Sequence, residues 1–266
     1  MNDQNKKPII ELIDVHKRFG EQEVLRGVNL SIHEGTTTVI TGASGTGKSV
    51  ILKHMMGLVK PTKGRVLVFG REINSLDKKE LREIRTAFGV LFQNVALFDS
   101  MTVFDNVALP LRERTRASEE EIRKNVEDKL KVMDLKDIND KYPAQLSGGM
   151  LKRVGLARAL VLNPKVIFFD EPTTGLDAQK SNEVYRLFYR SQMKFGYTAI
   201  IVSHDFPRIF KLSDYIALLY DGRIVSSVTP EEFQLSDHPA IKSFVETTMG
   251  PIYISEEEES DYNEKI

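Results

Sequence analysis

Eight consecutive residues, 42–49, have the types and spacing of a loop that binds phosphate. They read Gly-Ala-Ser-Gly-Thr-Gly-Lys-Ser, follow the apolar run 37–40 and precede a helix-prone stretch at 50–57. Glycines let successive backbone N–H groups turn toward a phosphate, and the helix N-terminus adds a partial positive charge. In this pattern Lys48 reaches the β- and γ-phosphates, and the hydroxyl of Ser49 suits Mg²⁺. The expected nucleotide contacts are Gly42, Ala43, Ser44, Gly45, Thr46, Gly47, Lys48, Ser49 and Val50.

The nucleoside triphosphate site that this loop predicts also needs a carboxylate near its Mg²⁺. An apolar run at 166–169 leads directly into Asp170 and Glu171. Strand ends face the nucleotide in such α/β sheets, so both side chains are expected in the pocket. Asp170 would hold Mg²⁺, usually through water, and Glu171 would orient the attacking water or accept its proton. By themselves, the two acids are explained equally well as a strand that ends in charged residues.

A third segment, residues 146–149, reads Leu-Ser-Gly-Gly. Ser147, Gly148 and Gly149 stand at the start of a predicted helix over 150–162, which makes a second helix N-terminus that could bind an anion. The simpler interpretation is ordinary N-capping, because Ser and Gly are common at such positions. The chain thus has two segments that could bind phosphate but only one phosphate-loop lysine, Lys48. This combination suggests a site that is shared between copies of the chain.

The composition sets limits on the class of protein. The chain has 266 residues, 41% of them apolar, which allows one large α/β domain with appendages or two small domains. Its formal net charge of −1 gives no strong field that would draw it to nucleic acid, and it has no cysteine for disulfides or Cys-based zinc sites. Neither a signal peptide nor an apolar run of the ~20 residues needed to span a bilayer is present. We therefore expect a cytoplasmic protein whose membrane role, if any, is peripheral.

Strand and helix patterns alternate along the chain, with one interruption. From about 103 to 133 the residues are mostly helix formers without a strand signal, and Ser118 with Glu121 forms a plausible capping box. This block is expected to be a helical insertion in an α/β core. Strands are expected at 9–15, 24–32, 37–41, 65–69, 89–92, 166–169, 198–202, 215–220 and 224–228, and further helices at 77–85, 150–162, 178–195, 230–235 and 240–248.

In this order, the motifs resemble the nucleotide-binding subunit of ATP-binding-cassette (ABC) transporters over roughly residues 8–228. The resemblance implies an α/β fold: a P-loop NTPase (RecA-like) core, an N-terminal antiparallel β subdomain, and an α-helical subdomain inserted at about 94–155. A C-terminal helical extension is expected at 229–254, followed by an acidic flexible tail at 255–266. The motifs that carry the resemblance are residues 42–49, Gln93, 146–149, Asp170, Glu171, 175–177 and His204.

The resemblance also implies how ATP and Mg²⁺ are bound. Two copies of the chain would sandwich two ATP molecules, with Ser147 and Gly149 of one copy gripping the γ-phosphate that Lys48 of the other copy binds. Gln93 would touch Mg²⁺ or the attacking water and report to the membrane partner. His204 would contact the γ-phosphate, although a single histidine after a strand is more often structural.

Two further residues have a role in the family and a simpler explanation on their own. Asp177 would lie at the dimer interface, but an aspartate before a helix at 178 is also a normal N-cap. Phe19 occupies the place of the aromatic residue that stacks on adenine, but it could equally be a core or strand-end residue.

Met150, where many family members carry Gln, stands out together with residues 97–107 and 203–207. This combination resembles the ATPase of Mce/Mla-type lipid transporters, which move phospholipid or related lipids between the inner and outer membranes of diderm bacteria. It implies an ATPase that powers lipid transport from the cytoplasmic face of the inner membrane. The partners implied are a second ATPase copy, transmembrane permease subunits, a small regulatory subunit and a substrate-binding Mce-domain protein, with no nucleic acid.

The resemblance places two partner contacts outside the nucleotide site. The segment after Gln93 forms, in the family, a groove for a coupling helix of the permease, which needs exposed apolar anchors. Ordinary packing of the helical block would explain each anchor as well. The C-terminal segment 239–254 would pack on the opposite subunit, on a regulatory partner, or on its own chain. The permease-contact residues are Leu97, Phe98, Met101 and Phe104.

Other classes of protein fit less of the sequence. One is the ATPase of another importer or exporter, and a second is a regulatory ABC ATPase that acts on a membrane complex without moving a solute. DNA-repair and chromosome types have long coiled-coil insertions, and translation types usually have two cassettes, neither of which is found here. A phosphate-loop kinase would lack the 146–149 motif and His204.

Overall fold

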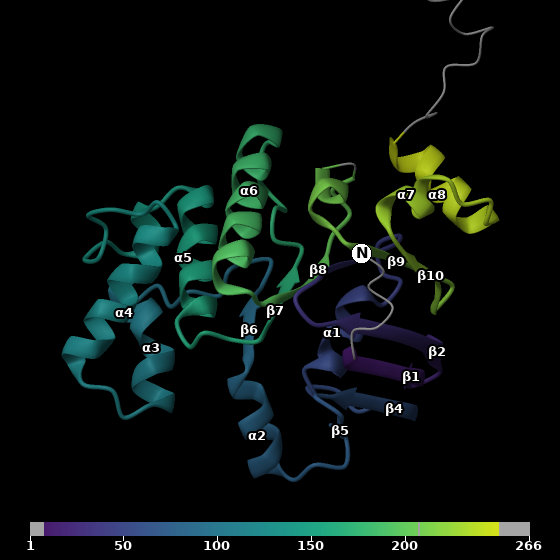
Figure 1. Ribbon diagram of the computed structural model, residues 1–266, viewed down its shortest axis with the longest axis horizontal. Helices are drawn as coiled ribbons and strands as arrows, with labels where there is room; N and C mark the ends of the chain where they lie inside the picture. Colours follow the sequence, from purple (N-terminus) through teal and green to yellow (C-terminus); the bar gives the residue numbers. More distant parts are fainter. Residues whose placement is uncertain (1–7, 207, 250–266) are drawn as a thin grey trace, which may run out of the picture.

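The computed structural model describes residues 8–206 and 208–249 (Figure 1). Within them lie two sheets, a four-stranded one in the order β2-β1-β4-β5 and a six-stranded one in the order β10-β9-β3-β8-β7-β6. The strands are β1 (Pro8–Phe19), β2 (Gln22–His33), β3 (Thr37–Thr41), β4 (Lys63–Val68), β5 (Arg71–Glu72), β6 (Phe88–Leu91), β7 (Val166–Asp170), β8 (Thr198–Val202), β9 (Tyr215–Tyr220) and β10 (Arg223–Val228).

The helices agree with the sequence pattern to within a few residues. The block expected at 103–133 is two helices, because Thr115 is extended and Ser118 starts a new helix with the predicted capping box to Glu121. The helices are α1 (Lys48–Met55), α2 (Lys78–Thr86), α3 (Val103–Arg114), α4 (Glu119–Val132), α5 (Gly148–Leu160), α6 (Ala178–Phe195), α7 (Pro230–Gln234) and α8 (Pro239–Met249), with 3₁₀ turns at Pro143–Gln145 and Arg208–Leu212.

The six-stranded sheet is parallel except for the hairpin strand β10. Parallel strands all end at the same edge of the sheet, so the segments that follow β3, β6, β7 and β8 meet there. These segments are the phosphate loop after β3, Gln93 after β6, Asp170 and Glu171 at the end of β7, and His204 after β8. Strand direction alone therefore gathers the predicted chemistry at one edge.

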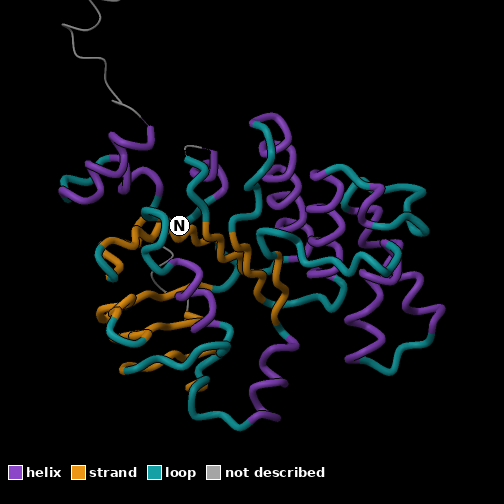
Figure 2. The backbone as a smooth tube through the Cα atoms, turned by 180° about the vertical axis from the view of Figure 1, so that it is seen from behind, coloured by secondary structure: helices purple, strands orange, loops and turns teal. Residues whose placement is uncertain are grey.

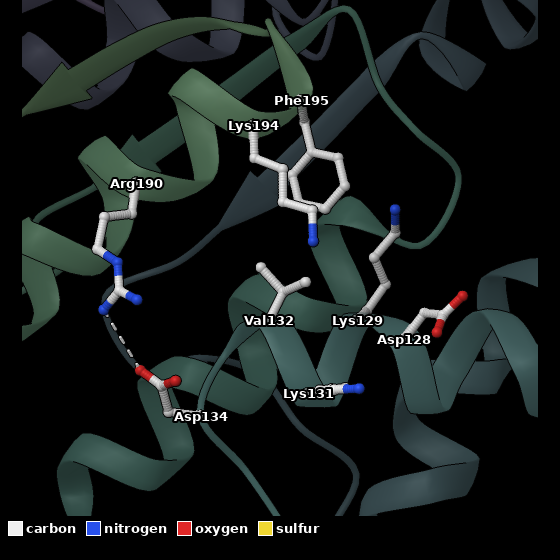
Figure 3. A pocket seen from close by; sticks show the side chains of 8 residues that line it. All are labelled: Asp128, Lys129, Lys131, Val132, Asp134, Arg190, Lys194 and Phe195. Atoms are coloured by element: carbon white, nitrogen blue, oxygen red, sulfur yellow. Dashed lines mark ion pairs between the residues drawn. The ribbon is translucent and has the colours of Figure 1, made fainter.

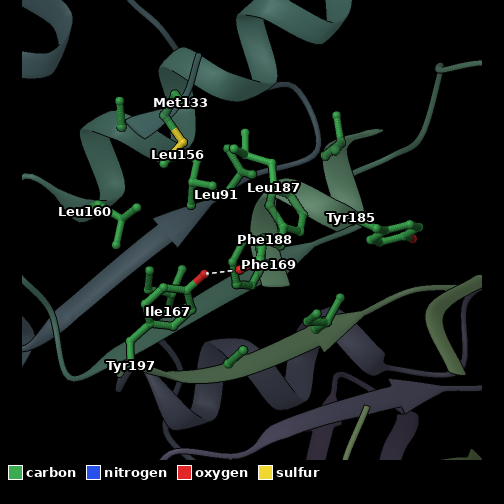
Figure 4. Close-up of a cluster of buried hydrophobic side chains, with 14 of the residues drawn as sticks. Leu91, Met133, Leu156, Leu160, Ile167, Phe169, Tyr185, Leu187, Phe188 and Tyr197 are labelled. Carbon is green, nitrogen blue, oxygen red and sulfur yellow. Dashed lines mark hydrogen bonds between the residues drawn. The ribbon is translucent and has the colours of Figure 1, made fainter. Parts of the chain in front are cut away.

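Both faces of this sheet are buried, as expected for a parallel sheet with continuous apolar strands. Along β7, Phe168 belongs to one hydrophobic cluster and Phe169 to the other. Phe168 meets Phe88 edge-on at 5.1 Å between ring centroids, while Phe169 packs at 4.6 Å against Phe188 on the opposite face. Figure 4 shows the second cluster, in which residues of β6 and β7 meet α5 and α6.

Different elements cover the two faces. The buried apolar residues of α1 and of the four-stranded sheet belong to the cluster that contains Phe168. Those of α3, α4, α5 and α6 belong to the cluster that contains Phe169. In Figures 1 and 2, α3, α4 and α5 stand to one side of the sheet, and α1 stands on the other with the small sheet. The helix after the phosphate loop and the helix after the 146–149 motif therefore lie on opposite faces.

The C-terminal helices pack on their own chain. Phe233 of α7 and Phe244 of α8 form a ring cluster with Phe206 and Phe210, with centroid distances between 4.8 and 6.5 Å. This contact agrees with the intrachain alternative for the start of the segment 239–254, whose residues 250–254 fall outside the described part, as does the tail 255–266. None of the helices in the described part is long and apolar enough to cross a membrane.

Candidate functional site

The phosphate loop has a backbone that only glycine permits at two positions. Gly42 has φ 143° and Gly47 has φ 107°, both in the region that favours glycine. A Cβ at Gly42 would overlap the Leu219 carbonyl oxygen of β9, and a Cβ at Gly47 would lie 2.8 Å from Val24 Cγ1. The loop therefore fits closely between β9 and β2, and its glycines are needed for the approach as well as for the turn.

Lys48 begins α1 and folds back over the loop. Its Nζ donates to the carbonyl oxygens of Gly42 and Ala43, both at 2.8 Å. Burial lowers the pKa of Lys48, while the charges of Glu171 and Asp170 act in the opposite direction. An ammonium group buried beside a helix N-terminus and bound to carbonyl oxygens is well placed to bind a phosphate.

Two oxygen ligands suited to Mg²⁺ lie side by side. Ser49 Oγ donates to Asp170 Oδ1 at 2.9 Å, which joins the start of α1 to the end of β7. The described residues contain no group of three or more His, Cys, Asp or Glu side chains that could hold a metal ion alone. Mg²⁺ in nucleotide sites is normally bound by one or two protein oxygens with substrate phosphates and water, so this pair fits it. Bound there, the ion would offset the charge of the phosphates.

Glu171 has an unusual backbone and a direct partner. Its φ is 50°, in the left-handed region that non-glycine residues rarely adopt, and its N–H donates to the Val202 carbonyl of β8 at 2.9 Å. Its Oε2 lies 2.7 Å from His204 Nδ1. The Glu171 side chain is 16% exposed and that of His204 is 63% exposed, so the pair opens toward solvent at the nucleotide edge. The structure thus brings these two predicted residues together.

A buried hydroxyl network, not anticipated from the sequence, supports the segments on either side of this pair. The Tyr185 hydroxyl of α6 lies 2.9 Å from Thr173 Oγ1 and 3.2 Å from Ser203 Oγ. Asp205 joins the same network, accepting from Thr173 Oγ1 at 3.3 Å and donating its N–H to Ser203 Oγ at 3.0 Å. Burial raises the pKa of Tyr185 well above its usual range, so the hydroxyl keeps its proton. Tyr185 was missed because nothing in its spacing separates it from an ordinary core residue.

The loop that carries Gln93 is held by side chains of α5. Lys152 Nζ donates to the Gln93 carbonyl oxygen. Arg158 donates to the carbonyls of Val95 and Ala96 at 2.6 and 2.7 Å. Val95 and Ala96 both have positive φ, so the loop makes a tight turn at this point. The Gln93 side chain itself is exposed.

Gly155 allows this loop to approach α5. A Cβ at Gly155 would overlap Val95 Cγ1 and lie 2.7 Å from Leu91 Cδ1. Lys152, Gly155 and Arg158 stand three residues apart, on one face of the helix. The helix that begins at Ser147 is therefore packed directly against the loop of Gln93, a link that motif spacing does not reveal.

Ser147 caps α5 and is exposed. Its side chain accepts from the Met150 N–H at 3.3 Å, which confirms the N-capping interpretation. A Cβ at Gly149 would meet nothing within 4 Å, so the backbone of this helix start is open to a ligand. The helix α5, which Ser147 caps, covers the face of the sheet opposite to the one covered by α1, which Lys48 begins.

Two more predicted residues lie at exposed element ends. Asp177 is the N-cap of α6 and accepts from the Lys180 N–H at 2.8 Å, as the simpler interpretation proposed. Phe19 ends β1 and is 49% exposed, with Lys17 Nζ 4.9 Å from its ring centre. It is therefore a strand-end residue with a free ring face rather than part of the core.

The four residues expected to meet a permease differ in exposure. Phe98 is 50% exposed. Leu97 and Phe104 are partly buried against the helical core, and Phe104 also lies 5.3 Å from the Arg123 guanidinium. Met101 is half-buried. Packing accounts for much of Leu97 and Phe104, whereas Phe98 is available to a partner.

The family model for the ABC transporter matches residues 25–174 of this chain. The chain belongs to the ABC transporter family. This family accounts for the geometry at the strand ends: the chain binds ATP, with Mg²⁺ as its usual partner ion, and hydrolyses it.

Three named proteins are similar to this ABC ATPase over most of its length. The Mycobacterium leprae "Probable ribonucleotide transport ATP-binding protein mkl" is 41% identical over 94% of this chain and 72% of its own. The methionine import ATP-binding protein MetN of Carboxydothermus hydrogenoformans is 41% identical over 84% of this chain and 66% of its own. The intermembrane phospholipid transport system ATP-binding protein MlaF of Haemophilus influenzae is 36% identical over 92% of this chain and 93% of its own.

Solved structures show the same fold. CbiO1 from Clostridium perfringens, part of the ABC transporter complex cbiONQ, has a TM-score of 0.80 and 30% identity over 91% of this chain and 96% of its own. The cassette MJ0796, seen as a dimer in a post-hydrolysis state with ADP and Pi, has a TM-score of 0.75 and 36% identity over 83% of this chain and 98% of its own.

We expect Gly155→Ala to destabilise the protein, although alanine normally favours a helix over glycine. The new methyl group would overlap Val95, and overpacking of this kind costs about 1–3 kcal/mol. The free energy of unfolding in urea and the ATPase rate should both fall. Adding Val95→Ala, which removes the overlapping methyl, should recover part of the loss. A double variant no better than the single one would show that the close approach is not the cause.

We expect Tyr185→Phe to lower the ATPase kcat while the protein remains folded. The change removes one hydroxyl and leaves Thr173 and Ser203 without their shared partner, at a cost of about 1–3 kcal/mol in stability. The loops that carry Asp177 and His204 would then be less well fixed. Tyr197→Phe is the matched control, because its buried hydroxyl bonds Ser191 and the Phe188 carbonyl away from the nucleotide edge. Equal kcat values for the two variants would argue against a positioning role.

Proposed function

We propose that this ABC ATPase powers the transport of phospholipid or a related lipid through a membrane permease. The likeness to MlaF supports this proposal, because it extends over nearly the whole of both chains. Mkl and MetN have a higher sequence identity to this chain, 41% in both cases. The matched region, however, covers only 72% of mkl and 66% of MetN. The Met150 signature and the segments 97–107 and 203–207 of the sequence point in the same direction.

At the nucleotide site, we propose that Lys48 and the loop 42–49 bind the β- and γ-phosphates, with Phe19 against the adenine. Ser49 and Asp170 would hold Mg²⁺, with Gln93 close to the ion or the water. The contact between Glu171 and His204 supports a joint role, in which Glu171 orients the water and His204 contacts the γ-phosphate.

We propose that the complete site is formed by two copies of the chain. The placement of α1 and α5 on opposite faces of the sheet supports this, as does the dimeric form of MJ0796. Ser147 and Gly149 of one copy would then grip the phosphate bound by Lys48 of the other. Asp177, exposed at the start of α6, would lie at the seam between them.

We propose the following organisation around this site. The ATPase domain spans residues 8–228 with a helical subdomain at about 94–155, followed by a helical extension at 229–254 and a tail at 255–266. The subunit would lie at the cytoplasmic face of the inner membrane and reach a permease through the region of Phe98. A regulatory subunit and an Mce-domain protein would complete the complex.

The names of the other relatives define the alternatives. Ribonucleotide transport is named for mkl and methionine import for MetN, so a solute importer is the second candidate. A regulatory ATPase that moves nothing is the third. Affinity purification from membranes, with identification of the partner subunits and of co-purified lipids, separates them. Transfer of phospholipid between vesicles by the reconstituted complex is expected, and ATP-driven uptake of methionine or ribonucleotide in its place would overturn the lipid proposal.

We expect Glu171→Gln to lower the steady-state ATPase rate at least 100-fold, because the variant can no longer accept a proton from the water. ATP binding should persist, so the protein should form an ATP-dependent dimer that gel filtration detects. Glu34→Gln is the matched control, since Glu34 is exposed and lies before β3, at the end of that strand opposite to the phosphate loop. Near-normal turnover by Glu171→Gln would remove this residue from its proposed role.

We expect two inactive variants, Ser147→Arg and Lys48→Ala, to restore activity to each other when mixed. In a mixed dimer, Lys48 of the first variant meets Ser147 of the second, which leaves one intact site. With random pairing, half of the dimers are mixed, so about a quarter of the wild-type ATPase rate should return. Each variant alone at the same total concentration is the control. A mixture no more active than its components would rule out a shared site.

A further inference from the structure

A cavity of about 550 Å³ lies away from the nucleotide edge, between the C-terminal half of α4 and the C-terminal end of α6 (Figure 3). Phe195, on its wall, stands just before β8 begins, and Asn163, which contacts the same wall, stands just before β7. The cavity is therefore at the amino edge of the six-stranded sheet, opposite the strand ends that carry the ATPase site.

Lys129 of α4 is the most unusual residue of this cavity. It is only 7% exposed, and its Nζ donates to Asn163 Oδ1 at 2.7 Å and lies 4.0 Å from the centre of the Phe195 ring. Among the ion pairs of the described residues, none includes Lys129. A buried ammonium without a carboxylate partner is costly. Burial accordingly lowers the pKa of Lys129; the charge of Asp128 opposes this shift, and that of Lys194 adds to it.

Lys194 of α6 brings a second positive charge to the same ring. Its Nζ lies 5.6 Å from the centre of Phe195. Figure 3 shows the ammonium ends of Lys129 and Lys194 on the same side of the cavity, close to that ring. Two cations gathered at one aromatic side chain repel each other, and an anion between α4 and α6 would relieve that repulsion.

The other charged side chains do not balance these two. The wall also carries Lys131 and Arg190, against the acids Asp128 and Asp134. Asp134 is engaged by Arg190 at 3.7 Å and by Arg153, outside the cavity, at 4.0 Å. Four basic groups against two acids leave a surplus of two positive charges.

We propose that this cavity binds a phosphate group. A phosphate monoester carries a charge of about −1.5 to −2 at neutral pH, which matches the surplus, and lysine is a common phosphate ligand as a point charge. Val132 supplies an apolar part of the wall for an attached organic group. A phosphate bound by Lys129 and Lys194 would join α4 of the helical block to α6 of the core.

The test uses inorganic phosphate as the probe, in the Lys48→Ala background so that the nucleotide site contributes little. At phosphate well above its Kd, Tm should rise by about 3 °C or more relative to chloride at equal ionic strength. The rise should disappear when Lys194→Gln is added. Lys124→Gln, at an exposed lysine on α4, should leave it intact.

A second arm identifies the source of the phosphate. Vesicles of phosphatidylcholine are compared with vesicles that also contain phosphatidic acid, whose headgroup is a phosphate monoester. Binding of the protein to the vesicles with phosphatidic acid would identify a lipid headgroup as the source. This binding should be lost in Lys194→Gln and in Lys129→Gln and kept in Lys124→Gln. A Tm rise without this binding would identify a soluble phosphate.

The proposal fails if neither probe binds, or if Lys194→Gln responds like Lys124→Gln. Lys194 is exposed, so its replacement should not prevent folding, and the result does not depend on the buried Lys129. The lipid transport proposal is not at stake, because the binding test needs neither permease nor ATP hydrolysis.

Discussion

The site depends above all on the parallel hydrogen-bonded register of β3, β8, β7 and β6. Because these strands run in one direction, four segments far apart in the sequence end at one edge without any contact among their side chains being required. The side-chain contacts then fix the details. The Ser49–Asp170 hydrogen bond links the helix that follows β3 to the end of β7. The Glu171–His204 contact links the residue after β7 to the segment that follows β8. Both faces of the sheet must be covered for such strands to be stable, which explains why helices of unrelated sequence flank it.

One helix connects features that the sequence presents separately. The start of α5 carries Ser147, and its middle holds the main chain around Gln93 through Lys152, Gly155 and Arg158. A displacement of the helix start would therefore be transmitted to the loop that carries Gln93. This connection holds the main chain at Gln93, whose side chain is exposed, and the exposed Phe98 stands only a few residues farther along the same chain.

Most of the architecture could be predicted from the sequence, because apolar runs, glycines and caps determine local structure. The nine expected strands, the capping box at Ser118 and the phosphate loop lie where their patterns placed them, whereas the two-residue strand β5 was not expected. The Tyr185 network and the contact of Gly155 with Val95 could not be predicted in this way, since each depends on the packing of elements remote in sequence. The exposure of Phe19, and the partial burial of Leu97 and Phe104, depend on the same long-range packing.

The backbone of Glu171 has a consequence for how this protein can change. A left-handed conformation at a residue with a side chain costs roughly 1 kcal/mol or more, and glycine at that position would relieve it. The substitution that best relaxes the fold here would thus delete the carboxylate. In the role that we propose for Glu171, this substitution would also abolish ATP turnover. Selection of variants for thermal stability alone would therefore favour stable cassettes with little ATPase activity.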